Sequence, residues 1–122
     1  MSELTGARFV LAVADLAASR NFYIRVLGFE EEAIHAPGWA FLRRDAVRLM
    51  LGECPDAPPA GTLGDHAWFA QIEVRDIHSL YEKVRGAGGT ILAELAERPW
   101  GMTEFCLRTI DGQRIVFAEL TA

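Results

Sequence analysis

Aromatic side chains at unusual positions are the residues of this 122-residue chain best suited to binding chemistry. Trp100 stands between Pro99 and Gly101, a context that suits neither a helix interior nor a central strand. An indole on such a joint can cover a hydrophobic core, or it can stack on a flat ligand and contribute about 1 kcal/mol beyond the burial of its area. The local sequence leaves both interpretations open.

The cysteines and histidines form no recognisable catalytic or metal-binding motif. Cys54 and Cys106 lack the spacing of a metal or redox motif, and Cys106 has no identifiable neighbouring base. Of the histidines, His35 is expected near the end of a strand and His78 in the first turn of a helix. His66 precedes a predicted strand, and only a shift in register would bring it to the functional face.

Composition and charge narrow the classes of partner. The formal net charge of −5 argues against nucleic acid and slightly favours a neutral or cationic ligand. No apolar stretch approaches the roughly 18–20 residues of a membrane span, and the start MSELTGARF lacks the features of a signal peptide. We therefore expect a cytoplasmic protein without disulfides, with no membrane partner.

The elements that must position these side chains occur twice. Asp15 precedes Gly28 by 13 residues, and Asp76 precedes Gly89 by the same interval. Each Asp follows a short apolar run and precedes about ten residues of helical character, so it is predicted to cap a helix. Each Gly is predicted to close that helix in the left-handed conformation. Two further stretches, DAVRLMLGE at 45–53 and DGQRIVFAE at 111–119, match in the same order.

Each copy therefore predicts the order β-α-β-β-β, and the chain is expected to be one α+β domain over residues 1–122. Module one covers about residues 6–53, a linker rich in Pro and Gly covers 54–65, and module two covers about 66–120. The copies are 61 positions apart at Asp15 and Asp76, but 66 apart at Asp45 and Asp111. The second copy thus carries about five extra residues, most naturally in the segment around Trp100.

Two stretches, VADLAASRNFYIRVLGFE and RPWGMTEFCLRTIDGQRIVFAE, resemble the vicinal oxygen chelate superfamily of glyoxalases, extradiol dioxygenases and bleomycin-resistance proteins. The resemblance extends from residue 8 to residue 119. It implies two tandem βαβββ modules whose curved sheets form a cup, usually completed in a homodimer. Residues 109–112 read TIDG where the family commonly has Asp-Pro-Asp-Gly, which alters a turn.

The same resemblance raises the question of a metal ion, because enzymes of the superfamily hold a divalent ion with His and Glu. The matching positions here are Arg8, Met50, Phe69 and Val116. Arginine, phenylalanine and valine offer no lone pair, and a thioether prefers soft metals. We therefore expect no metal cofactor. The alternative is a divalent metal ion in a shifted register, with His66 and either Glu104 or Glu119 as donors.

Strand alternation extends this face of the sheet by every second residue. The face mixes aromatic and charged residues as ligand pockets do, while the opposite face is apolar and suits packing on helices. Aromatic residues are also enriched at dimer interfaces, and the two roles can coexist. The predicted ligand-binding residues are Arg8, Trp39, Phe41, Arg48, Met50, Phe69, Gln71, Trp100, Glu104, Arg114 and Val116.

The leading hypothesis is a metal-independent small-molecule binder of the bleomycin-resistance type, which sequesters an aromatic drug or metabolite and so confers antibiotic resistance. The alternative, which leaves enzymatic activity open, is a metal-dependent glyoxalase-like lyase or isomerase, or a dioxygenase. A third hypothesis is a structural or regulatory dimer with an empty cup. All three predict a homodimer, because an open sheet edge in a small module favours being covered. The candidate carboxylates near the groove are Glu53, Glu73, Glu104 and Glu119.

Overall fold

The computed structural model describes residues 1–121 and confirms the α+β class, with two mixed four-stranded sheets. The first sheet has the order β1 (Phe9–Val13), β4 (Val47–Glu53), β3 (Trp39–Arg44) and β2 (Glu30–Glu31). The second has the order β5 (Trp68–Glu73), β8 (Arg114–Leu120), β7 (Met102–Arg108) and β6 (Thr90–Arg98). In each sheet the first strand pairs in parallel with the last strand of the same module. Each sheet is thus completed within its own half of the chain.

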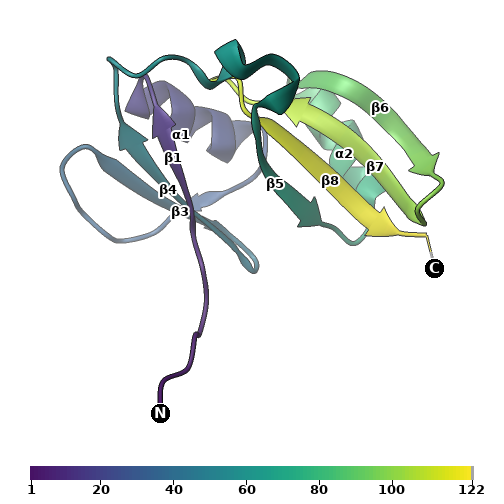
Figure 1. The fold of residues 1–122 in the computed structure, drawn as a ribbon, viewed down its shortest axis with the longest axis horizontal. Helices are drawn as coiled ribbons and strands as arrows, with labels where there is room; N and C mark the ends of the chain where they lie inside the picture. Colours follow the sequence, from purple (N-terminus) through teal and green to yellow (C-terminus); the bar gives the residue numbers. More distant parts are fainter. Residues whose placement is uncertain (122) are drawn as a thin grey trace.

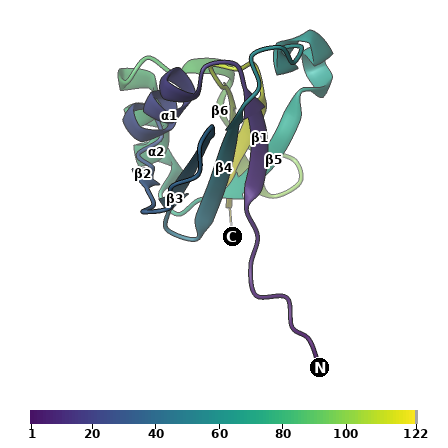
Figure 2. The same ribbon diagram turned by 90° about the vertical axis from the view of Figure 1, so that its left-hand side faces the viewer.

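The helices α1 (Leu16–Arg25) and α2 (Ile77–Gly86) cover the same side of the sheets, as Figure 2 shows. The buried face of α2 consists of Ile77, Leu80, Tyr81 and Val84, as the periodicity predicts. These residues join the inward side chains of both sheets in one continuous hydrophobic cluster. In the middle of the molecule β1 lies next to β5 (Figure 1), where the rings of Phe9 and Phe69 meet edge to face at 5.7 Å.

The two helices begin in different ways. The carboxylate of Asp15 accepts a hydrogen bond from the amide of Ala18 at 3.1 Å, which confirms the predicted cap of α1. The prediction for Asp76 is wrong, because this residue is in the left-handed conformation (φ 61°, ψ 57°) and its side chain makes no capping bond. Glu119 takes that role: its carboxylate accepts from the amides of Asp76 and Ile77 at 2.9 and 3.0 Å.

The glycines that follow the helices differ in the same way. Gly28 has φ 70°, as predicted for the end of the first helix. In the second copy Gly88, with φ 86°, and not Gly89, has the left-handed conformation. Gly89 is required for another reason, because a Cβ there would lie 2.6 Å from Cγ1 of Val84. The repeat therefore predicted the position of the Gly88-Gly89 pair correctly, but it assigned the left-handed conformation to Gly89 in place of Gly88.

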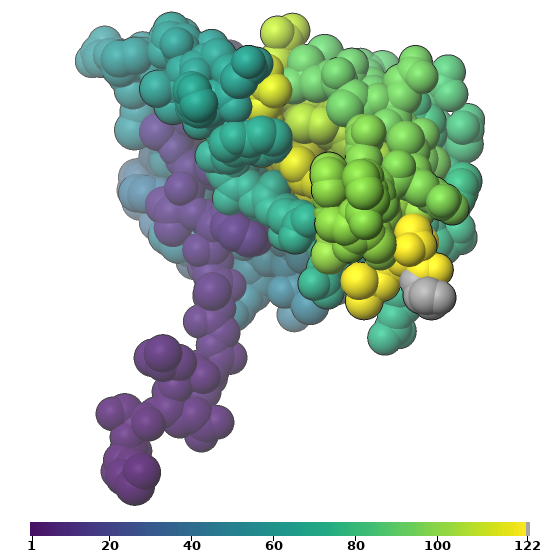
Figure 3. Space-filling view, turned by 45° about the vertical axis from the view of Figure 1, so that its right-hand side comes forward, coloured from purple at the N-terminus to yellow at the C-terminus, as the bar shows by residue number. Residues whose placement is uncertain are grey.

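The segment between the modules contains more structure than its composition predicts. Residues 60–66 form a 3₁₀ segment, η1 (Ala60–His66), interrupted at Gly64 where φ is 57° and ψ is −126°. The expectation of an irregular linker thus holds only for residues 54–59. Ahead of the first strand, the N-terminal residues extend from the body of the molecule (Figure 3). Neither helix of the described chain is long and apolar enough to cross a membrane.

Candidate functional site

The sheet faces opposite the helices carry most of the predicted binding residues. Along β1, Leu11 is buried against the helices while Val10 and Ala12 are exposed on the other side. The same alternation buries Leu42 in β3 and leaves Phe41 on the open face. Each module therefore presents one open face, formed by its own four strands.

On the open face of module one, Arg8 forms an ion pair with a carboxylate. The guanidinium of Arg8 donates to both carboxylate oxygens of Glu32, at 2.6 and 3.2 Å. The hydrogen bond from Arg8 lowers the pKa of Glu32, and the same contact raises that of Arg8. The guanidinium also lies over the ring of Phe41, 5.3 Å from its centroid. Arg8 thus contacts a carboxylate neighbour and covers an aromatic ring that was predicted to contact ligand.

The other predicted residues of module one lie against neighbouring backbone or strands. Trp39 pairs with Gly52, and a Cβ at Gly52 would lie 2.9 Å from two ring atoms of Trp39. The glycine therefore allows the indole to lie on the sheet. Met50 pairs with Phe41 across the strands, and the guanidinium of Arg48 packs against Gly6 in the N-terminal segment. These five predicted residues share one side of the module.

The open face of module two is hollowed into a pocket of about 630 Å³. Five predicted binding residues line it: Phe69, Gln71, Trp100, Glu104 and Val116. Trp68 and Ala70 complete the lining. The pocket is therefore built from β5, β7, β8 and the turn between β6 and β7.

Glu104 is the chemically distinctive residue of this pocket, because its carboxylate is buried with the residue only 7 % exposed. The indole N–H of Trp100 donates to Oε1 at 2.9 Å, and the side-chain amide of Gln71 donates to Oε2 at 3.2 Å. Both donors are neutral, and each carboxylate oxygen keeps a further lone pair. The arrangement can therefore accept a hydrogen bond from a ligand cation or N–H group.

The Pro-Trp-Gly joint is explained by the same hydrogen bond. Trp100 lies in the turn between β6 and β7, where Gly101 has φ 83°. Its side chain is 63 % exposed, so it does not close the hydrophobic core. The hydrogen bond to Glu104 instead fixes the indole at the edge of the pocket.

A local irregularity in β5 explains why strand alternation did not predict Trp68 as a pocket residue. A shift in register between Trp68 and Ala70 adds one residue to β5, so strict alternation fails at Phe69. Both aromatic residues consequently reach the pocket, and Trp68 is 55 % exposed. The sequence feature that could have indicated this is the pair of adjacent aromatic residues, Trp68 and Phe69, at the start of β5.

Arg114 supports Trp68 and does not itself line the pocket. Its guanidinium lies 5.8 Å from the centroid of the Trp68 ring and donates to Asp65 at 2.9 Å. Cys106, in the neighbouring strand, is buried, and burial raises the pKa of its thiol. This thiol therefore has the character of a packed side chain and not of an activated nucleophile.

The residues do not fit the divalent ion that the family resemblance implies. Within residues 1–121, no three His, Cys, Asp or Glu side chains are placed so that they could hold a metal ion together. His66 is exposed on η1, and Glu119 is held at the start of α2. Glu53 accepts the amide of Leu16 at 3.0 Å in the same way, so neither of these glutamates is a groove carboxylate.

Comparison with protein families matches residues 7–117 to the Glyoxalase/Bleomycin resistance protein/Dioxygenase superfamily. A bleomycin resistance determinant encoded on the transposon Tn5 has a similar structure: 21 % identity, TM-score 0.80, 98 % of this chain and 100 % of that chain covered. The bleomycin-binding protein from bleomycin-producing Streptomyces verticillus, complexed with copper(II)-bleomycin, is 29 % identical with TM-score 0.72 over 96 % and 97 % of the two chains. TioX from Micromonospora sp. ML1 is 21 % identical with TM-score 0.74 over 94 % and 95 %. No curated protein matches the chain.

Proposed function

The chain belongs to the glyoxalase/bleomycin resistance protein/dioxygenase superfamily, and we propose that it binds and sequesters a flat aromatic molecule. The binding site is the pocket of module two, and binding requires no metal ion. Because the superfamily fold serves both enzymes and binders, the site and not the fold has to carry the proposal. The observation that carries it is the buried carboxylate of Glu104, held by Trp100 and Gln71 on the floor of an open aromatic pocket.

The size and lining of the pocket suit a small organic ligand. A volume of about 630 Å³ lies within the roughly 300–1,000 Å³ typical of such sites. The exposed indoles of Trp68 and Trp100 offer two stacking surfaces, each worth about 1 kcal/mol beyond the area that a ligand would cover. We therefore expect the ligand to contain at least one planar ring.

The charge of the site favours a ligand with a cationic or hydrogen-bond-donating group. Glu104 receives neutral donors only, so a positively charged group would supply the counterion that a buried carboxylate ordinarily has. The net charge of −5 favours the same class. Bleomycin, which the Streptomyces verticillus protein binds as its copper(II) complex, is the first compound to test.

The test is a calorimetric titration of the protein with bleomycin, with its copper(II) complex, and with a set of aromatic cations and anions of matched size. Trp100→Ala and Trp68→Ala should each weaken the binding of a cation by at least about tenfold. Glu104→Gln should weaken the binding of the cations and leave the binding of the anions unchanged. Glu94→Gln, on the exposed side of β6, is the matched control and should change neither. Unchanged affinity in all three pocket variants would refute the proposed pocket.

Sequestration also makes a prediction about the fate of the ligand. A binder releases its ligand chemically unchanged after denaturation, and mass spectrometry of the recovered compound tests this. A converted product would support the lyase or dioxygenase hypothesis instead.

We further propose a homodimer, because the open face of module one leaves apolar side chains uncovered. Val10 is 59 % exposed and Trp39 is 40 % exposed on that face. Sedimentation equilibrium should give the mass of two chains, and Val10→Glu should shift it towards one. A monomeric native protein would contradict this assembly.

A further inference from the structure

The two modules are fastened together at one end of their interface. Asp111, in the turn before β8, accepts hydrogen bonds from the amide of Ala14 at 3.2 Å and from the hydroxyl of Ser19 at 2.6 Å. Gln113 donates to the carbonyl oxygen of Ala12 at 3.5 Å. These bonds join module two to the end of β1 and to α1, and Ser19 is buried among them.

The equivalent positions at the other end carry different residues. By the spacing of the repeat, Asp45 corresponds to Asp111, Val47 to Gln113 and Leu80 to Ser19. The side chains of valine and leucine have no polar atom, so the hydrogen bonds donated by Ser19 and Gln113 have no counterpart there. Instead, a cavity of about 240 Å³ lies between the modules. The hydrogen bonds of Asp111 and Gln113 close one end of the interface between the modules. The residues at the equivalent positions leave the other end open.

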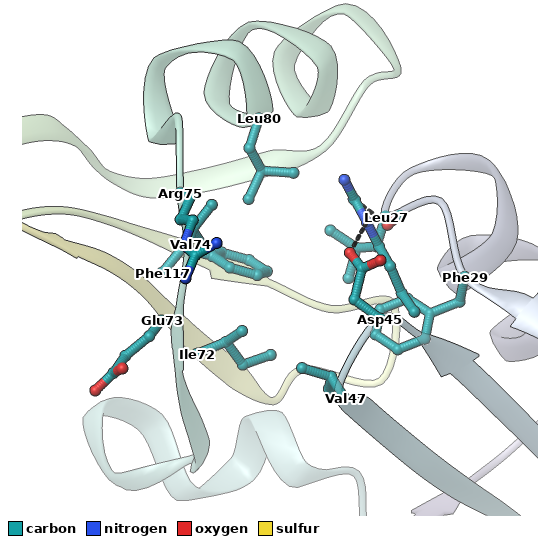
Figure 4. A pocket seen from close by; sticks show the side chains of 11 residues that line it. Leu27, Phe29, Asp45, Val47, Ile72, Glu73, Val74, Arg75, Leu80 and Phe117 are labelled. Atoms are coloured by element: carbon teal, nitrogen blue, oxygen red, sulfur yellow. Dashed lines mark hydrogen bonds and ion pairs between the residues drawn. The ribbon is translucent and has the colours of Figure 1, made fainter.

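The walls of the cavity are apolar and come from both modules. Leu27, Phe29 and Val47 face Ile72, Val74, Leu80 and Phe117 across the gap (Figure 4). An apolar cavity of about 150 Å³ is already sufficient to bind benzene. This cavity can therefore enclose a single ring or a branched aliphatic group with a short substituent.

The charged residues at the mouth indicate what that substituent is. Arg44 is committed to module one, since it donates to the carbonyl oxygen of Leu27 at 2.7 Å and lies 3.9 Å from the carboxylate of Asp45. Arg75 takes part in none of the ion pairs formed among residues 1–121. The carboxylate of Glu73 points away from the cavity in Figure 4. The cation at the mouth that lacks a counterion is therefore Arg75.

We propose that the cavity between the modules is a second small-molecule site, which takes a monocyclic aromatic or branched aliphatic carboxylate. The apolar body fills the space between the modules, and the carboxylate pairs with the guanidinium of Arg75. This site differs from the pocket of module two in place and in charge preference, because that pocket contains a buried carboxylate.

The experiment uses phenylacetate as probe and 2-phenylethylammonium as its cationic counterpart of matched size, each added to the full chain with labelled methyl groups. Phenylacetate should shift the NMR signals of Val47, Ile72 and Leu80, and the cation should not. Arg75→Gln should weaken phenylacetate by at least about fivefold, while Arg25→Gln, an exposed arginine at the end of α1, should leave it unchanged. Trp100→Ala should also leave it unchanged, which separates this site from the proposed pocket.

Filling the cavity supplies an independent variant. Val47→Phe should abolish the phenylacetate shifts while the protein stays folded, as judged from the remaining methyl signals. If that variant does not fold, the comparison of the wild-type protein with Arg75→Gln decides alone. The proposal is overturned if phenylacetate causes no shift at the cavity methyls at about 10 mM. It is equally overturned if the cation shifts them as strongly, or if Arg75→Gln binds phenylacetate as the wild type does.

Discussion

Module one and module two have the same strand order, but they place charged residues in different surroundings. On the open face of module one, Arg8 and Glu32 neutralise each other, and the arginine covers Phe41. On the open face of module two, Glu104 is buried with neutral donors only. One copy of the duplicated face therefore pairs its carboxylate with an arginine, whereas the other surrounds its carboxylate with neutral donors.

The steric scheme of the two faces is nevertheless shared. Trp39 pairs with Gly52 between β3 and β4, and Glu104 pairs with Ala118 at the equivalent place between β7 and β8. In each module a small residue in the last strand leaves room for a large side chain in the strand before it. The duplicated scaffold has thus kept its geometry while the chemistry of the large side chain diverged.

The most disruptive test of the comparison is to remove equivalent core side chains. Leu49 and Ile115 are at most 1 % exposed and occupy matching positions in β4 and β8. Leu49→Ala and Ile115→Ala should each lower the free energy of unfolding by about 3 kcal/mol. Because both belong to one continuous cluster, urea denaturation should show a single transition in either variant. Separate transitions would mean that the modules unfold independently.

The asymmetry of the interface between the modules is tested by a pair of isosteric changes. Asp111→Asn removes the negative charge of a carboxylate that accepts two hydrogen bonds, one of them from the buried hydroxyl of Ser19. This change should lower the free energy of unfolding by about 1–2 kcal/mol. Asp45→Asn should cost less than about 0.5 kcal/mol, since Asp45 is exposed and asparagine tolerates its positive φ of 51°. Equal losses in urea denaturation would contradict the difference between the two ends.

The carboxylate of Glu119, which caps α2, predicts how the stability of the protein responds to acid. The amides of Ile77 and Asp76 lower the pKa of Glu119, so its contribution to stability is complete above the ordinary carboxylate pKa of about 4.3 and is lost as pH falls through the lower, folded-state value. Urea midpoints of Glu119→Gln should therefore fall less steeply than those of the wild type between about pH 5 and pH 3. At pH 7 the urea midpoint of Glu53→Gln should change less than that of Glu119→Gln, since Glu53 accepts one helix amide and Glu119 accepts two.

The smallest effect is expected at the ion pair of module one. Arg8 lowers the pKa of Glu32, so this pair also stabilises the protein above the ordinary carboxylate range and loses that effect in acid. Salt screens such a pair, and Glu32→Gln should change the urea midpoint at pH 7 less than Glu119→Gln does. A larger change, persisting in about 1 M salt, would show that the pair is essential to the face.

The fold and most of the open faces could be predicted, because periodicity depends only on the intervals between residues. The buried stripe of α2 and the alternation in β1 and β3 follow directly from this. The family resemblance and the alternation along the strands together placed Gln71, Glu104 and Val116, from three different strands, on one face.

The misses have in common that they depend on geometry between elements. The irregularity at Trp68 shifts a side chain without any change in composition. The cap of α2 comes from Glu119, 43 positions away from the amide of Asp76, which no local pattern around Asp76 reveals. The cavity between the modules arises where two copies meet, and the sequence of either copy alone contains no trace of it.

The completion of each sheet within its own half has a practical consequence. Within residues 1–121 no strand is exchanged between the two sheets, so this part of the backbone crosses from one half to the other only through the segment that links β4 to β5. Cutting that segment would yield two fragments, each with its full set of strands, whose reassociation buries the shared core. A compound that binds between the fragments would stabilise the reassociated form. The divided chain could therefore serve as a split reporter whose signal depends on a small molecule.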